Sequence, residues 1–393
     1  MSNTLKFGNG EWYGKKDTIL AYNDENSNFK PLPFSFDRAS SATVVNKAGL
    51  IETVGSGEPR IDYKDDSKGA LLLENSATNV IINSEDFTGS EWVLYGYASG
   101  DAPILTSNYD TSPDGKQNAT RLQFNLNGGT TTTDRSYIRY NSFASQTDYY
   151  YSCYVKSANG QEQKLLWQHG GDDNEFTVTN EWQRVELDRN GNAETFTGFS
   201  LRGGISTVDT ADVLVWGFQV EQRSYATSYI PTQGSAVTRI GDVCNNGGND
   251  QVINSTEGVL YAEISALAND GTTRTISLND NSGSNVIRIS NTTTSNEVNF
   301  IVRANSNIYV YNQVLSDITT INKLAISYSS SGAKVFINGI LSDSGALSSL
   351  PTGLSQLDFR YGNGTLPFYG NVKDVRVYNT TLTDAELISL TSL

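Results

Sequence analysis

The sequence has few of the residues that most often build catalytic and metal sites. Its 393 residues include one histidine, His169, so a Ser-His-Asp triad, a typical zinc site or a histidine acid would have to use it. His169 follows an apolar run and precedes two glycines, which favours a polar loop residue. The sequence therefore predicts no catalytic residue and a protein that is not an enzyme.

Cysteine is equally scarce. Cys153 and Cys244 are the two cysteines, and they lie far apart in the sequence. One distant pair does not make the disulfide framework of a small secreted domain. We expect free thiols, and a disulfide between the two cysteines is the less favoured alternative.

The chain also lacks basic runs and long apolar runs. Its 28 Lys and Arg against 43 Asp and Glu give a net charge of −15, which repels phosphate. No apolar run reaches the roughly 18 residues of a membrane helix, and residues 1–6 hold no apolar signal region. The sequence therefore predicts no nucleic-acid partner, no membrane insertion and no signal peptide.

What the chain does contain is typical of β-structure. It has 21 tyrosines and 35 glycines, and Ser, Thr and Asn are abundant, which favours turns and sheet surfaces. Alternating, β-branched or aromatic runs predict strands at 149–156, 212–220, 259–264, 298–303, 323–328 and 372–378. Such short strands with regular turns predict an all-β protein of two β-sandwich domains.

Local signals mark the turns and a single helix. Asn-Gly pairs, which favour tight turns, lie between strand-like runs at 159–160, 190–191 and 338–339. Residues 383–386, Thr-Asp-Ala-Glu, form a capping box, and Leu387, Ile388 and Leu390 follow as an apolar face. We expect a short terminal helix that docks on the last sheet.

Changes in composition suggest the domain boundaries. The first 75 residues contain few long strand runs, and residues 231–256 are rich in Gly and Asn. The sequence predicts an N-terminal arm at 1–75, a β-sandwich at 76–235, a linker at 236–256 and a second β-sandwich at 257–393.

Several short strings with fixed spacing mark the N-terminal segment, namely Phe34 to Thr43, Gly49 to Ile51, Glu58 to Tyr63, Gly69 to Glu74, Thr78-Asn79 and Ser84 to Phe87. With these strings the segment resembles a recurring segment of tailed-phage fibre and other virion surface proteins. The resemblance implies that residues 1–75 are a virion-attachment arm.

The two predicted sandwiches resemble lectin-like families. Residues 112–122, 181–185 and 216–232, the last of which includes Trp-Gly-Phe-Gln-Val-Glu, are similar to a carbohydrate-binding-module-like jelly roll. Residues 323–328, 334–339 and 368–387 are similar to the central hairpin, closing strand and helix of concanavalin A-like (laminin G-like) domains.

Together the resemblances imply a bacteriophage virion structural protein, a tail or head fibre that presents lectin-like domains to host surface glycans. The arm would bind other virion proteins, and the lectin-like domains would bind host cell-surface polysaccharide. The protein would be located on the virion surface. Fibre proteins of this kind are usually homotrimers. A purely architectural decoration protein is the alternative, and a polysaccharide depolymerase, which would need a carboxylate pair, is less favoured.

Sugar sites combine flat aromatic rings with polar groups that orient hydroxyls. On that ground the candidate ligand-binding residues are Trp92, Tyr95, Tyr97, Trp167, Tyr309, Tyr311, Arg360 and Tyr361. Tyr95 and Tyr97 alternate and so share one strand face, as do Tyr309 and Tyr311, which we expect at the surface with Ile308 and Val310 in the core. Core packing stays open for the tryptophans, and an ordinary sheet surface for the tyrosines.

No cofactor is predicted, although calcium is common in such sandwiches through carboxylates and carbonyls. The candidates are Asp172 with Asp173, and Asp280 with Asn281. Neither pair matches a spaced calcium loop, so solvated acidic turns are the favoured alternative.

Overall fold

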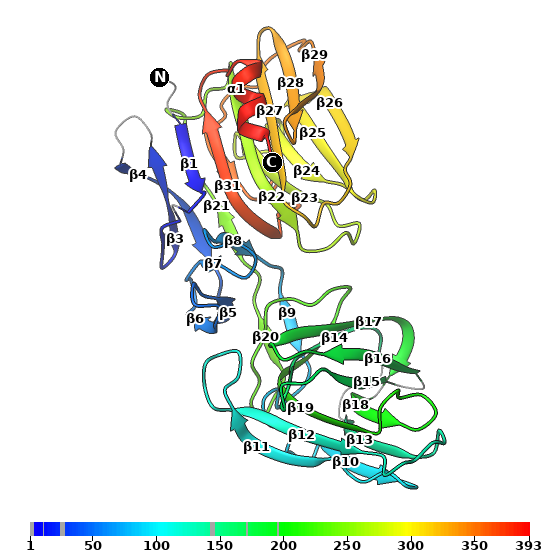
Figure 1. The fold of residues 1–393 in the computed structure, drawn as a ribbon. Coiled ribbons are helices and arrows are strands. Elements are labelled where there is room, and N and C mark those ends of the chain that lie inside the picture. Colours follow the sequence, from blue (N-terminus) through cyan, green and yellow to red (C-terminus); the bar gives the residue numbers. More distant parts are fainter. Residues whose placement is uncertain (1–3, 11, 24–27, 142–145, 170–171, 195) are drawn as a thin grey trace. The chain divides into compact units, whose positions relative to one another are not determined.

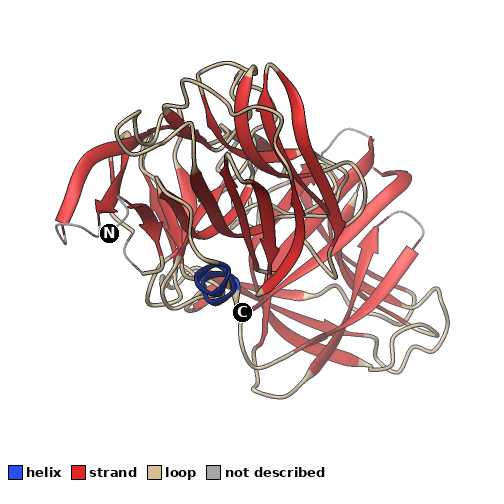
Figure 2. Cartoon of the chain, turned by 90° about the horizontal axis from the view of Figure 1, so that it is seen from above, coloured by secondary structure: helices blue, strands red, loops and turns tan. Residues whose placement is uncertain are grey.

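The computed structural model describes residues 4–10, 12–23, 28–141, 146–169, 172–194 and 196–393. Strands dominate these residues, and they hold one α-helix, as Figure 2 shows by colour. The predicted all-β class with β-sandwich domains is thereby confirmed. No helix in the described ranges is long and apolar enough to cross a membrane.

The chain forms two compact units (Figure 1). Unit 1 comprises residues 1–49, 53–76 and 240–393, and unit 2 comprises residues 50–52 and 77–239. The second unit is therefore inserted into the sequence of the first. This division differs from the predicted arm, linker and two consecutive sandwiches.

Unit 1 is a sandwich of two sheets. The strands of the larger sheet are β1 (Thr4–Gly8), β2 (Gly14–Lys15), β3 (Thr18–Asn23), β4 (Asn28–Asp37), β7 (Arg60–Asp62), β8 (Ala70–Leu73), β21 (Val243–Asn245), β22 (Gly258–Ala266), β27 (Asn322–Ser329), β28 (Gly332–Ile337), β29 (Ile340–Gly345) and β31 (Gly370–Tyr378). Its main order is β21-β4-β3-β1-β31-β22-β27-β28-β29.

The smaller sheet of unit 1 covers the core from the other side. Its strands are β23 (Arg274–Asn279), β24 (Asn285–Asn291), β25 (Glu297–Ala304), β26 (Ser306–Val314) and β30 (Gln356–Asp358), in the order β26-β25-β24-β23-β30. Alternate residues of both sheets, such as Ile287 and Ile289 on one and Leu324 and Ile326 on the other, share one buried cluster. This period of two is what a sheet with one buried face requires.

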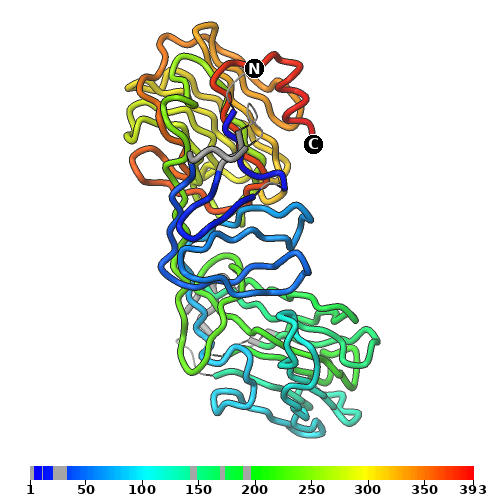
Figure 3. The backbone as a smooth tube through the Cα atoms, turned by 90° about the vertical axis from the view of Figure 1, so that its left-hand side faces the viewer, coloured from blue at the N-terminus to red at the C-terminus, as the bar shows by residue number. Residues whose placement is uncertain are grey.

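The N-terminal segment is part of this sandwich rather than a separate arm. β1 pairs with β31 from Thr4 opposite Tyr378 to Gly8 opposite Asp374, and β8 pairs with β31 as well. Leu5, Phe7 and Phe34 are fully buried in the same core, with the Phe7 and Phe34 rings 4.4 Å apart. Figure 3 shows the start of the chain beside its C-terminal part within unit 1. The short apolar runs were too brief to signal this pairing.

A buried network of charges lies where the chain leaves unit 1 and returns to it. Arg38 donates to Asp242 at 3.0 Å, and Arg60 donates to both Glu74 and Asp242. All four side chains are at most 2 % exposed. Burial alone would lower the pKa of Arg60, but Glu74 and Asp242 raise it above its ordinary value. The two arginines and two carboxylates balance in charge, which makes their burial tolerable.

Unit 2 is a second sandwich of two five-stranded sheets. One sheet contains β10 (Trp92–Tyr97), β13 (Arg135–Tyr140), β18 (Thr197–Arg202), β15 (Gln163–His169) and β16 (Asp172–Val178), in that order. The other contains β11 (Ile104–Asp110), β12 (Ala119–Asn125), β19 (Thr210–Gln222), β14 (Gln146–Ser157) and β17 (Gln183–Glu194), in that order. Between them lies a core rich in aromatic residues.

Buried hydrogen bonds hold the closing strand of unit 2 to its exit. Glu221 accepts hydrogen bonds from the amide and hydroxyl of Thr227 at 2.9 and 2.6 Å, and Gln219 accepts one from the Ile230 amide at 2.7 Å. The Tyr229 hydroxyl lies 2.6 Å from that of Ser84. The string around residues 216–232 is therefore a structural element of the sandwich.

Two short pairings complete the strands. β9 (Ala77–Asn79) pairs with β20 (Val237–Arg239), which joins the entry and exit of unit 2. β5 (Ala42–Val45) and β6 (Ile51–Val54) form a hairpin sheet of their own. The predicted linker at 236–256 thus contains β20 and β21, so it is structured.

The predicted strands and helix are largely present. All six predicted strand runs fall within β14, β19, β22, β25, β27 and β31, and Asn338-Gly339 forms the turn between β28 and β29 with positive φ at both residues. Asn190-Gly191 lies inside β17 instead of at a turn, and Asn159-Gly160 links β14 and β15, which belong to different sheets. The helix α1 (Asp384–Thr391) has the predicted capping box, but Ile388 on its expected apolar face is 41 % exposed.

We predict that Asp242→Asn destabilises the protein by about 3–5 kcal/mol, because it leaves two buried arginines with one carboxylate. Urea unfolding of the full chain measures this as a lower midpoint. Lys334→Gln is the matched control, because Lys334 pairs with Asp384 at an exposed position, where a pair is worth about 0–1 kcal/mol. Equal midpoints for the two variants would show that the buried network adds nothing.

Both cysteines are free and buried, as expected from the sequence. Burial raises the pKa of the Cys153 and Cys244 thiols well above their ordinary value. We therefore predict no reaction of the native protein with a thiol-specific chromogenic reagent at pH 8, and release of two equivalents once guanidinium chloride unfolds it. Fast reaction of native protein would contradict the burial.

Candidate functional site

The outer face of one sheet of unit 2 carries an exposed row of aromatic residues. Along β10, Trp92 and Leu94 point into the core, so the alternate residues Val93, Tyr95 and Tyr97 point outward. Tyr95 is 46 % exposed and Tyr97 53 %. Large exposed side chains in a continuous row are unusual on a sheet surface and mark interaction sites.

The tyrosines form a platform with a third ring from the next strand. Tyr95 and Tyr97 are stacked with their centroids 6.4 Å apart, and Tyr137, directly opposite Tyr95 in the ladder, lies 5.6 Å from Tyr95. We call Tyr95, Tyr97, Tyr137 and the neighbouring Arg139 the tyrosine platform. Its rings are held by cross-strand packing, so a ligand would lose little entropy in ordering them.

Arg139 is held by contacts with two rings and one amide. Its guanidinium carbon lies 4.6 Å from the Tyr137 ring centre and 4.0 Å from that of Phe196, and Nη2 donates to Gln168 at 3.2 Å. Its Nε is buried without a hydrogen-bond partner among the described residues. These contacts with two rings hold the guanidinium in place beside the tyrosines.

Further polar residues lie on the same sheet beyond the platform, on β18 and on β16 at the opposite edge. Arg202 pairs with Asp173 at 2.6 Å, and Glu175 accepts hydrogen bonds from the amide and hydroxyl of Thr207. Burial raises the pKa of Glu175, but the bonds from Thr207 and the charge of Lys164 outweigh it and lower the pKa overall. Both carboxylates are thus engaged, and Glu175 stays ionised, which does not suit a general acid.

Two predicted candidates, Trp92 and Trp167, lie in the core of unit 2. Trp92 is 5 % exposed and packs edge-on against Tyr140 and Phe218. Trp167 is 2 % exposed, and its indole Nε1 donates to the Thr197 hydroxyl at 2.8 Å. Neither ring can receive a ligand in this arrangement, which is the core alternative that the sequence left open.

Tyr309 and Tyr311 face the opposite way from the prediction. Both pack toward the core of unit 1, where Tyr309 is 8 % exposed and donates to Asp343 at 2.6 Å, while Val310 is 52 % exposed. Burial and the bond to Asp343 raise the pKa of Tyr309. A tyrosine can fill a core and still place its hydroxyl at the sheet edge, which is why alternation alone assigned the wrong face.

Arg360 and Tyr361 lie close together after β30 but serve internal contacts. Arg360 lies 3.4 Å from the carboxylate of Asp358, and the hydroxyl of Tyr361 donates to the Gly283 carbonyl at 2.8 Å. Arg288 stacks on the Tyr361 ring at 5.1 Å. Only Tyr95 and Tyr97 of the predicted residues therefore join into one exposed face.

Tyr137 and Arg139 were missed by the sequence reasoning. Their run, Arg-Ser-Tyr-Ile-Arg-Tyr at 135–140, alternates as clearly as residues 92–97 do. Ile138 and Tyr140 are buried, so the alternate residues Tyr137 and Arg139 face outward. Applying the period of two to this run would have found them.

The calcium candidates are occupied by internal bonds where the structure describes them. Asp173 pairs with Arg202, and the side chain of Asp172 lies outside the described residues. Asp280 accepts hydrogen bonds from Ser282 and Asn285, which forms a closed turn. No cluster of three or more His, Cys, Asp or Glu suited to a metal occurs among the residues described.

A family model matches the C-terminal part of unit 1. Residues 248–388 match the family model of the concanavalin A-like lectin/glucanases superfamily. This match contains β22 to β31 but none of β1 to β9. The C-terminal part of unit 1 is thus a lectin-like domain by sequence, as predicted. No curated protein matches the chain significantly.

Solved structures share the fold only distantly. The CBM40 of Ruminococcus gnavus IT-sialidase, bound to α2,3 sialyllactose, is 17% identical with a TM-score of 0.32, over 37% of this chain and 92% of that one. Domain 4 of AbnA, a GH43 arabinanase from Geobacillus stearothermophilus in complex with arabinotriose, is 14% identical with a TM-score of 0.33, over 43% and 84%.

A Trypanosoma rangeli sialidase is 10% identical with a TM-score of 0.31, over 95% of this chain and 65% of that one. At such identities and TM-scores these likenesses carry no argument about ligand or activity.

Proposed function

We propose that this protein is a glycan-binding surface protein and that the tyrosine platform is its principal binding face. The observation that carries the proposal is the exposed pair of stacked rings, Tyr95 and Tyr97, with Tyr137 and Arg139 packed beside them. The lectin-like family match of residues 248–388 supports the same class of function.

The chemistry of the platform suits a sugar chain. Tyrosine rings offer flat apolar area to the C–H faces of sugar rings, and their hydroxyls offer hydrogen bonds at the rim. Arg139 adds a donor beside the rings, and its bond to the buried Gln168 fixes it there. The face is open, so it suits successive residues of a polysaccharide better than a single small molecule.

We further propose that the protein is a tail or head fibre of a bacteriophage. The support is the likeness of the strings between Phe34 and Phe87 to virion surface proteins. Attachment to other virion proteins, a homotrimeric state and a place on the virion surface are parts of this proposal. Repetition in a trimer would strengthen a weak sugar site through avidity.

We propose binding in preference to hydrolysis. Two carboxylates at the opposite edge of the platform sheet, Asp173 and Glu175 of β16, are held by Arg202 and by Thr207. A depolymerase needs a paired acid and base at the scissile bond. Release of reducing ends from host polysaccharide would revive the enzymatic alternative.

The decisive test is binding of the purified full chain to intact host cells and to an array of bacterial polysaccharides. We predict that Tyr95→Ala and Tyr97→Ala each weaken glycan binding at least about tenfold, because each removes an exposed stacking surface (about 1.4 kcal/mol or more). Periodate oxidation of the glycans should abolish binding of the unchanged protein.

Tyr109→Ala is the matched control. Tyr109 is also an exposed tyrosine, 43 % accessible and stacked with an arginine, Arg121, at 4.7 Å, but it lies on the other sheet of unit 2. Its loss should leave the affinity unchanged. Equal glycan binding by all three variants would contradict the platform as the binding face. No binding of the unchanged protein to any glycan would favour the architectural decoration protein.

A further inference from the structure

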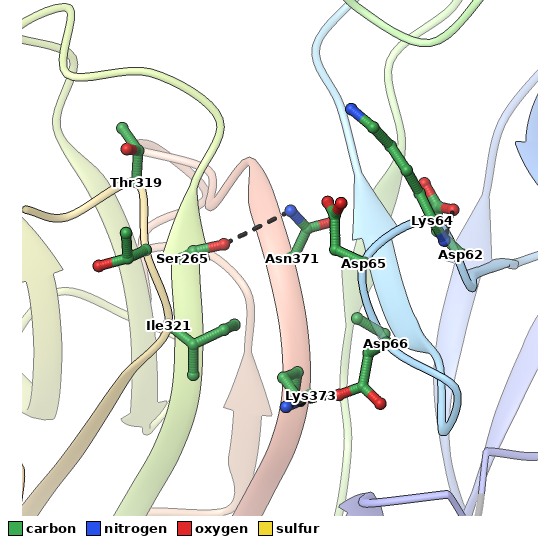
Figure 4. Close-up of a pocket in the computed structure, with 11 residues that line it drawn as sticks. Asp62, Lys64, Asp65, Asp66, Ser265, Thr319, Ile321, Asn371 and Lys373 are labelled. Carbon is green, nitrogen blue, oxygen red and sulfur yellow. Dashed lines mark hydrogen bonds and ion pairs between the residues drawn. The ribbon is translucent and has the colours of Figure 1, made fainter. Parts of the chain in front are cut away.

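A polar cavity lies in unit 1, whereas the tyrosine platform belongs to unit 2. Figure 4 shows the loop that follows β7 facing β31, β22 and the segment before β27. The cavity has a volume of about 270 Å³. Its lining consists of Asp62, Lys64, Asp65, Asp66, Ala70, Ser265, Thr319, Thr320, Ile321, Asn371 and Lys373.

Some of the lining groups are bound to one another, and others are left for a ligand. Lys373 pairs with Asp66 at 2.5 Å, and Asn371 donates to the buried Ser265 hydroxyl at 3.4 Å. Asp62 accepts one hydrogen bond, from the Lys64 amide at 2.9 Å, and this uses only Oδ1. Within the described residues, Asp62 Oδ2 and the whole carboxylate of Asp65 have no hydrogen-bond partner.

The half-buried position of Asp62 is unfavourable for an ionised group. Burial raises the pKa of this carboxyl above its ordinary value, although the Lys64 amide acts in the opposite direction. A carboxylate in such a setting is stabilised by any donor that enters the cavity.

The lining also excludes one class of ligand. Three carboxylates face two ammonium groups, and one of those ammonium groups is already paired. The negative balance repels phosphate, sulfate and carboxylate groups. Ala70 and Ile321 add a small apolar surface between the polar groups.

Free carboxylate oxygens, an amide, hydroxyls and a small apolar surface together match a sugar ring, whose hydroxyls alternate with C–H groups. The volume of about 270 Å³ lies just below the range of ligand pockets, roughly 300 to 1,000 Å³, which suits one sugar unit and not a longer chain. We propose that this cavity binds one uncharged monosaccharide unit of a glycan, with Asp62, Asp65 and Asn371 as the groups that hold its hydroxyls.

Only part of the cavity wall comes from the segment that matches the family model. Asp62 to Ala70 lie outside the matched residues 248–388, whereas the other wall lies inside them. The N-terminal segment therefore completes this site. The proposal goes beyond the platform, because it concerns different residues in the other unit.

The test uses the full chain with methyl-labelled isoleucine and the methyl glycosides of glucose, galactose, mannose and N-acetylglucosamine as probes. We predict that at least one of them shifts the Ile321 methyl signal in a saturable way and leaves that of the exposed Ile340 in place. Asp65→Asn, at an exposed loop position, should weaken this binding at least tenfold, and Asp62→Asn should weaken it further.

Asp250→Asn, an exposed aspartate of unit 1 away from the cavity, is the control and should bind as the unchanged chain does. Tyr95→Ala should also keep the Ile321 response, so failure of the platform and failure of the cavity are distinguishable. No saturable shift with any sugar would overturn the proposal. A shift produced by calcium or magnesium chloride but by none of the sugars would overturn it in favour of a cation site.

Discussion

The structure of unit 1 depends on four charges that are buried together. Arg38, Arg60 and Glu74 come from the N-terminal segment, and Asp242 comes from the chain after unit 2. Removing charges from water is unfavourable unless each one is paired, so the fold is stable only when these distant segments meet. The Asp242 amide donates to the Glu74 carbonyl at 2.8 Å, which brings the two ends of the insertion side by side. Unit 2 can then be inserted there without opening the core of unit 1.

The same buried network gives a structural role to N-terminal residues that the sequence assigned to an attachment arm. The strings that contain Arg38, Arg60 and Glu74 resemble virion surface proteins, and we expected an attachment arm. Their charged residues are instead turned inward, and Arg60 reaches a partner 182 positions away. The strands themselves were predictable, because alternation is local. The pairing of β1 with β31 was not, because no local pattern states which strand will be the neighbour.

For the candidate site, too, local sequence patterns predict only part of the arrangement: they show which side chains share a face, but not which face is buried. Alternation correctly placed Tyr95 and Tyr97 on one face of β10. Trp92 of the same strand is buried between the two sheets, which fixes the tyrosine face as the outer one. For Tyr309 and Tyr311 the alternation was equally clear, but the choice of face was wrong. The position of the partner sheet decides which face of a strand is buried. A tyrosine can lie on the buried face as well as on the exposed one when its hydroxyl reaches a hydrogen-bond acceptor such as Asp343.

These contacts change how an attachment role can be tested. Deleting residues 1–75 would remove β1, β4 and β8 with their part of the unit 1 core and three of the four buried charges. Unit 1 would be destabilised, and any loss of function would include the effect of unfolding. An attachment surface must use what the N-terminal segment exposes, such as Tyr13, which is 49 % accessible. Substitutions at such exposed positions leave the network intact. They can therefore separate attachment to the virion from the stability of the sandwich, which a deletion cannot do.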